Sequence, residues 1–221
     1  MVDMLLGKKL AMTQIWDADG NIQPVTILHV GPCPVVQIKQ KDGKDGYDAV
    51  QLGFEDMPAK NMGKGDPRVN KPMQGVFKKA SMTPQRYLRE VRLEEGQKAP
   101  DQGAVLKVEQ VFTGVKQVDV IGTSRGRGFQ GCVRRHGFGG GRKSHGSKNH
   151  REPGSVSSNQ TPSRILKGKR LPGHMGAKRS TARNLDVVKI EAEHNLLYVK
   201  GAVPGPKNGF VLVRKAIAGS K

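Results

Sequence analysis

The side chains in this sequence best placed to do chemistry together are arginines and lysines spaced among glycines between Thr123 and Arg183. This segment of 61 residues contains fifteen basic side chains and a single carboxylate, Glu152. A guanidinium group can donate hydrogen bonds to two phosphate oxygens at once and can stack on a base, while glycine lets the main chain approach a sugar-phosphate surface. Positive charge this concentrated opposes its own compaction until an anion neutralises it. The segment therefore predicts binding to a polyanion.

The same chemistry recurs along the segment, as Arg-Gly-Arg-Gly-Phe at 125–129, Arg-Arg-His-Gly-Phe at 134–138 and Lys-Gly-Lys-Arg at 167–170. A flexible Arg-Gly linker is the alternative for the first of these, and the recurrence favours nucleic-acid binding. We predict RNA contacts from fourteen basic residues and one aromatic residue: Arg125, Arg127, Phe129, Arg134, Arg135, Arg142, Lys143, Lys148, Arg151, Arg164, Lys167, Lys169, Arg170, Lys178 and Arg179.

One stretch of this segment, Ser155–Pro162, carries no charge over eight consecutive residues. An uncharged, hydrogen-bonding turn halfway along a cationic arm is where a tip would lie. Asn159 and Gln160, next to Thr161, could then read base edges or brace a loop while the flanking cations hold phosphates. A plain solvent-exposed turn is the alternative.

Catalysis is the rival interpretation, because the segment contains four histidines. A zinc site usually draws on closely spaced Cys or His ligands, and only Cys132 lies nearby. Metal-dependent phosphodiester cleavage needs several carboxylates, and the segment offers only Glu152. We therefore expect no catalytic residue, metal or cofactor, and histidines that hydrogen-bond among phosphates: His136, His145, His150 and His174.

The composition supports nucleic-acid binding, since the 221 residues have a pI near 10.2 and only 5% aromatic side chains. A membrane-surface role would need a long amphipathic helix, which the glycines in 123–183 oppose. The first twelve residues do not have the charge order of a signal peptide. The two cysteines, Cys33 and Cys132, favour a reducing compartment. These features predict a cytoplasmic protein without a membrane segment.

The residues that flank the basic segment predict a mostly β domain, formed by 1–122 and 184–221, with 123–183 as an inserted extension. Many short strands without alternating helices favour a small closed or partly closed barrel. One helix is expected at Lys71–Lys79, with Asn70 as its cap and Pro72 in its first turn. The predicted strands are Ile22–Val30, Val35–Lys39, Tyr47–Phe54, Tyr87–Leu93, Val105–Phe112, Val115–Ile121, Leu185–Glu191, Asn195–Val199 and Phe210–Val213.

Several stretches of the sequence match a known family in order and spacing: Gly7–Ile15, Gly122–Gly131, His150–Ser155, Asn159–Pro162, Lys167–Gly176, Leu185–Val188 and Lys200–Gly205. With these stretches the sequence resembles the bacterial form of the large-subunit ribosomal protein L-three family over essentially its whole length. Ala11 departs from the family, which usually has glycine there.

This resemblance implies a six-stranded barrel like that of translation factors, with a long, largely irregular arm running through ribosomal RNA towards the peptidyl transferase centre. It implies a cytoplasmic, non-enzymatic constituent of the large (50S) subunit that binds 23S rRNA near its 3′ end and starts subunit assembly. It places Asn159, Gln160 and Thr161 at the tip, with Gln160 matching a glutamine that is N5-methylated in several bacteria. The implied partners are 23S rRNA, proteins of the L-fourteen and L-nineteen families, and a glutamine methyltransferase. A sequence-tolerant nucleic-acid compactor is the alternative that shares the charge.

Overall fold

A computed structural model describes residues 2–43, 45–57, 69–94, 96–157 and 160–217. The chain divides into two compact units. The main unit consists of Met1–Thr123 with Arg179–Lys221, and the inserted unit is Ser124–Lys178. The chain therefore leaves the main unit at Thr123 and returns to it at Arg179.

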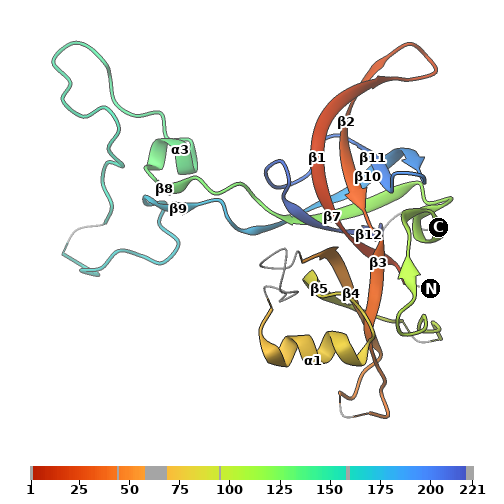
Figure 1. Ribbon diagram of the computed structural model, residues 1–221. Helices are drawn as coiled ribbons and strands as arrows, with labels where there is room; N and C mark the ends of the chain where they lie inside the picture. The colour runs from red at the N-terminus through yellow and green to blue at the C-terminus, as the bar shows by residue number, and fades with distance from the viewer. Residues whose placement is uncertain (1, 44, 58–68, 95, 158–159, 218–221) are drawn as a thin grey trace, which may run out of the picture. The chain divides into compact units, whose positions relative to one another are not determined.

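Six strands of the main unit form an antiparallel sheet that closes on itself in the order β1-β12-β7-β10-β11-β2 (Figure 1). The sheet closes because β2 pairs with β11 on one side and with β1 on the other. Closure removes the free strand edges that would otherwise be open to pairing with other chains. The strands are β1 (Met4–Trp16), β2 (Ile22–Val30), β7 (Gln117–Thr123), β10 (Arg179–Glu191), β11 (Leu196–Lys200) and β12 (Phe210–Lys215).

Aliphatic side chains from both flanks of the inserted unit build the core of this sheet. Leu28 of β2, Val120 of β7, Val199 of β11 and Val213 of β12 are all fully buried. Burying each such side chain stabilises the fold by about 1.5 to 3 kcal/mol. The prediction of a mostly β fold is confirmed, whereas the long strand β1 was not predicted.

A second antiparallel sheet has the strand order β5-β4-β3-β6. The sequence predicts strands here without dividing them between sheets, and in the structure they pair with one another rather than with the six strands of the closed sheet. The strands are β3 (Cys33–Lys39), β4 (Ala49–Asp56), β5 (Gln85–Arg92) and β6 (Val105–Leu106).

The expectation of a single helix is also wrong, since the described residues contain three. The predicted helix is present as α1 (Lys71–Lys79), although the Asn70 side chain makes no capping hydrogen bond. The strand predicted at Val105–Phe112 is instead the short β6 followed by α2 (Val108–Phe112). The third helix, α3 (Cys132–His136), lies in the inserted unit. None of the helices in the described part of the chain is long and apolar enough to cross a bilayer.

The inserted unit holds one small two-stranded sheet, β8 (Gly128–Gln130) and β9 (Gly173–Met175), in addition to α3. The boundary of the main unit also differs from the predicted one. Residues 179–183, which the sequence assigned to the basic extension, are the first part of β10. Residues 179–182 pair with β7, where Arg179 lies opposite Thr123.

Candidate nucleic-acid interface

The inserted unit begins and ends as two antiparallel chain segments held together by backbone hydrogen bonds. The Ser124 N–H donates to the Lys178 carbonyl at 2.8 Å, and the Arg127 N–H donates to the Met175 carbonyl at 2.9 Å. Further along, Phe129 of β8 lies opposite His174 of β9. The first basic cluster, residues 125–129, therefore lies on one short antiparallel ladder with its two arginines, Arg125 and Arg127. Its aromatic ring, Phe129, is 75% exposed.

Two side chains of helix α3 contact a segment of the inserted unit that is distant in the sequence. Arg135 Nη1 donates to the Leu171 carbonyl at 2.6 Å, and His136 Nε2 lies 2.9 Å from the same oxygen. The helix ends where Gly137 adopts a left-handed conformation with φ of 74°, which glycine reaches without steric cost. These contacts hold the second basic cluster, residues 134–138, beside the third basic cluster, residues 167–170.

Three glycines of this unit lie where neighbouring backbone leaves no room for a side chain. A Cβ at Gly176 would collide with the carbonyl oxygen of Arg125, one at Gly141 with that of Asn149, and one at Gly140 with that of His150. The glycine content that suggested a flexible linker therefore has, at these positions, a packing role.

The cations of the inserted unit have no carboxylate partner in the part of the chain that the structure describes. Among the described residues, no ion pair involves any basic side chain of this unit, and its one carboxylate, Glu152, is exposed. Of its thirteen Lys and Arg residues, all except Arg135 are solvent-exposed. Exposed positive charge without an internal partner is available to bind phosphate, and its binding releases counterions.

A hollow of about 550 Å³ in this unit combines two cations with close-packed backbone. Lys143 and Arg151 line it together with His150, whose Nδ1 lies 2.9 Å from the Arg142 carbonyl. The other lining residues are Val133, Gly139 and Gly141, so no carboxylate faces it. This chemistry suits an anionic group such as a phosphate.

The remaining predicted site residues are placed as follows. Gln160 and Thr161 lie exposed in a turn, where the Ser163 hydroxyl donates to the Gln160 carbonyl. Asn159 lies outside the described residues. Arg179 is exposed in β10 and belongs to the main unit. The structure thus brings the basic clusters at 125–129, 134–138 and 167–170 together through β8, β9 and α3. Among the described residues, no hydrogen bond or ion pair joins a basic side chain of these clusters to Gln160.

The histidines do not form a metal centre in the described part of the chain, where no three His, Cys, Asp or Glu side chains are grouped to hold an ion. His136 and His150 instead contact backbone carbonyls. Their geometry is that of side chains that brace the inserted unit.

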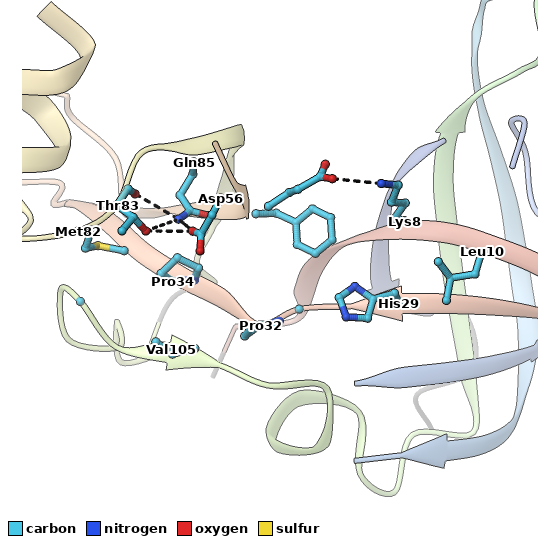
Figure 2. A pocket seen from close by; sticks show the side chains of 14 residues that line it. Lys8, Leu10, His29, Pro32, Pro34, Asp56, Met82, Thr83, Gln85 and Val105 are labelled. Atoms are coloured by element: carbon cyan, nitrogen blue, oxygen red, sulfur yellow. Dashed lines mark hydrogen bonds and ion pairs between the residues drawn. The ribbon is translucent and has the colours of Figure 1, made fainter. Parts of the chain in front are cut away.

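A second hollow, of about 660 Å³, lies in the main unit between β1, β2 and the sheet of β3, β4 and β5 (Figure 2). Lys8 pairs with Glu55 at 3.1 Å, and Asp56 accepts a hydrogen bond from the Thr83 hydroxyl at 3.0 Å. Burial, with the nearby Lys8 charge, lowers the pKa of His29 in its wall. Carboxylates in this hollow would repel phosphate, so it does not extend the candidate interface.

Sequence reasoning missed the bracing contacts of Arg135 and His136, and the hollow beside Lys143. The signal for α3 was present, because Cys132–His136 is followed by Gly137, which suits a helix C-terminus. The hollow depends on contacts of Gly141 with the carbonyl groups of Asn149 and His150. No local sequence pattern predicts these contacts.

An interface of exposed cations, glycine-dependent close packing and one exposed aromatic ring defines a class, that of nucleic-acid-binding proteins. Comparison with known proteins narrows it further. The family model of Ribosomal protein L3 matches residues 91–194. The chain is 50% identical over 212 residues to the large ribosomal subunit protein uL3 of Pelotomaculum thermopropionicum, covering 96% of each chain.

It is also 44% identical to the uL3 of Acetivibrio thermocellus over 100% of both chains, and 45% identical to that of Desulforudis audaxviator over 100% of this chain and 99% of the relative. The chain belongs to the ribosomal protein L3 family. The relatives are ribosomal proteins and not enzymes, in agreement with the expectation that the chain has no catalytic role.

Proposed function

We propose that this protein is a structural constituent of the large ribosomal subunit in the cytoplasm, and that its inserted unit binds large-subunit rRNA. The observation that carries the proposal is the set of exposed cations in Ser124–Lys178 that have no ion-pair partner among the described residues. Phosphates where RNA helices converge are the anions that such a surface fits. Family membership supports the assignment to the ribosome.

The finer parts of the proposal follow from the family resemblance. The inserted unit would run towards the peptidyl transferase centre, with the uncharged turn that contains Gln160 at its tip. The closed six-stranded sheet would be a barrel of the translation-factor type. Binding would occur near the 3′ end of 23S rRNA and help to start subunit assembly.

Two kinds of protein partner belong to the same proposal. Neighbouring large-subunit proteins of the L-fourteen and L-nineteen families would contact the main unit. A glutamine methyltransferase would modify Gln160, whose exposed position in a turn leaves the side chain accessible in the isolated chain.

The register between β7 and β10 provides a clean test. Because Thr123 and Arg179 are paired neighbours, an Asn-Gly turn can replace Ser124–Lys178 and join the two strands directly. The shortened chain should keep the fold of the main unit, since its core residues lie outside the deleted segment.

In cell lysates separated on sucrose gradients, the full chain should sediment with the large subunit and remain there after a high-salt wash. The shortened chain should be released by the wash. Retention of the shortened chain at the same salt would refute the role given to the inserted unit. A full chain spread over all RNA-containing fractions would indicate a sequence-tolerant polyanion binder.

A further inference from the structure

The far end of the β1–β2 hairpin carries apolar side chains that the described residues leave exposed. From Ala11 to Trp16, β1 pairs with β2 alone among the strands described, beyond the stretch that pairs with β12 (Figure 1). Met12 is 51% exposed, Trp16 is 68% exposed and Ile22 is 50% exposed. Trp16 is the only tryptophan of the chain.

These side chains share one face of the hairpin. Side chains alternate between the two faces of a strand, so Met12, Gln14 and Trp16 lie on the same side. Trp16 pairs with Ile22 and Gln14 pairs with Pro24, which places the partners on that side too. All five are exposed, and four of them are apolar. A face of this composition on a two-stranded hairpin, which is marginally stable alone, is typical of a contact surface.

The charge around this face is opposite in sign to that of the inserted unit. Residues 10–38 contain no lysine or arginine, and their only ionic side chains at neutral pH are Asp17 and Asp19 in the hairpin turn. The Asp17 carboxylate is used within the turn, where it accepts the Ala18 N–H at 2.8 Å and a hydrogen bond from Gln23. Asp19 is exposed and makes no ion pair with any described residue.

RNA is a poor match for this surface. A base could stack on Trp16, as bases do on exposed aromatic rings. The phosphates on either side of that base would then lie near two carboxylates, with no lysine or arginine among residues 10–38 to offset them. A protein surface that carries lysine or arginine beside apolar side chains matches both the apolar face and the negative charge of the hairpin turn. Its apolar side chains would cover the face, and its basic side chain would pair with Asp19.

We propose that the face formed by Met12, Gln14, Trp16, Ile22 and Pro24 is a docking surface for a second protein whose contact region is basic. Trp16 is the central anchor, since a large, rigid aromatic side chain contributes most when its partner excludes water from it. Asp19 pairs at the rim with a lysine or arginine of the partner. This inference rests on the proposed function, because the partner is met within the large subunit.

Photocrosslinking from the face itself tests the proposal in the assembled particle. The full chain is expressed with p-benzoylphenylalanine in place of Trp16, large subunits are purified, and the crosslinked product is divided between ribonuclease and protease digestion. We expect a product that resists ribonuclease and whose partner peptide, identified by mass spectrometry, is rich in lysine and arginine. The charge-reversing change Asp19→Lys should lower the yield of that same product about two- to fivefold, the range for losing an exposed ion pair.

Asp42→Lys is the matched control, since Asp42 also precedes a glycine in an exposed turn, and it should leave the yield unchanged. A crosslink to RNA or to a second copy of the chain would overturn the docking proposal, as would an unreacted photoprobe in purified subunits. In each of these cases the chain is still in the large subunit, so the proposed function stands. Absence of the chain from purified subunits would overturn both.

Discussion

Neutralising three cations of the inserted unit should flatten the salt dependence of RNA binding by a calculable amount. Lys167, Lys169 and Arg170 are exposed and have no ion-pair partner among the described residues, so replacing all three by glutamine costs the fold little. Each phosphate contact contributes about 0.7 to 0.9 to the slope of log affinity against log salt. The triple variant should therefore lose about 2 to 3 from that slope.

The consequence is large over an ordinary salt range. Between about 50 and about 200 mM salt, a slope smaller by this amount makes the loss of affinity about 20- to 40-fold smaller for the variant than for the parent chain. Filter binding to full-length large-subunit rRNA at several salt concentrations measures both slopes directly. Thermal melting of the two proteins should coincide, which separates a binding effect from unfolding.

A second triple variant controls for net charge. Lys41, Lys71 and Lys78 are exposed lysines of the main unit, and glutamine at all three changes the charge by the same amount. If the slope follows contacts made by the inserted unit, this control should retain nearly the parent slope. Equal slopes for the parent and the Lys167, Lys169 and Arg170 variant would refute the reasoning, and so would equal losses in the two triple variants.

Three further predictions concern single residues. Asp119 is 1% exposed and accepts hydrogen bonds from Arg214 and from the Asn184 N–H. Asp119→Ala leaves Arg214 without its partner and should lower the free energy of unfolding, measured by urea titration, by about 3 kcal/mol. A loss below about 1 kcal/mol would contradict this expectation. Burial lowers the pKa of His29 below its usual value of 6.5, so the unfolded chain binds more protons at this residue than the folded chain does. The free energy of unfolding should therefore fall as the pH drops through 6.5. His29→Gln should weaken that fall when thermal melting is measured at several pH values. Gln160→Ala should leave the melting temperature unchanged because the side chain is exposed, and a clear destabilisation would place Gln160 in a packed core.

Much of the closed sheet was predictable because its strands carry the signals that local sequence provides. Ile22–Val30 is rich in β-branched residues, and the predicted and observed bounds of β2 coincide. Lys71–Lys79 was predicted from Pro72 and its neighbours, and it forms α1. In both elements, local preference and tertiary packing favour the same conformation.

The failures occur where tertiary contacts decide. Val105–Phe112 has strand-like composition, yet Val108, Val111 and Phe112 are buried together on the short helix α2, since helical spacing places them on the core side. Which strands close the six-stranded sheet depends on pairings between residues just over 200 positions apart, such as Leu6 with Leu212, and no local pattern encodes these.

The candidate site was predictable in its chemistry and not in its geometry. Charge, glycine content and the scarcity of carboxylates in 123–183 identified cations that form no ion pair with any residue the structure describes. The contacts of Arg135 and His136 with the Leu171 carbonyl join residues that are 36 and 35 positions apart, respectively, so only the folded structure could show them.

The most direct test of the central claim is to identify which peptides of this protein contact RNA in the assembled particle. Purified large subunits are irradiated with ultraviolet light, and peptides that carry nucleotide adducts are mapped by mass spectrometry. The account predicts that adducts gather in Ser124–Lys178, at the exposed Phe129 and among the basic clusters, and that they map to large-subunit rRNA. Adducts confined to the main unit, with none in Ser124–Lys178, would contradict it.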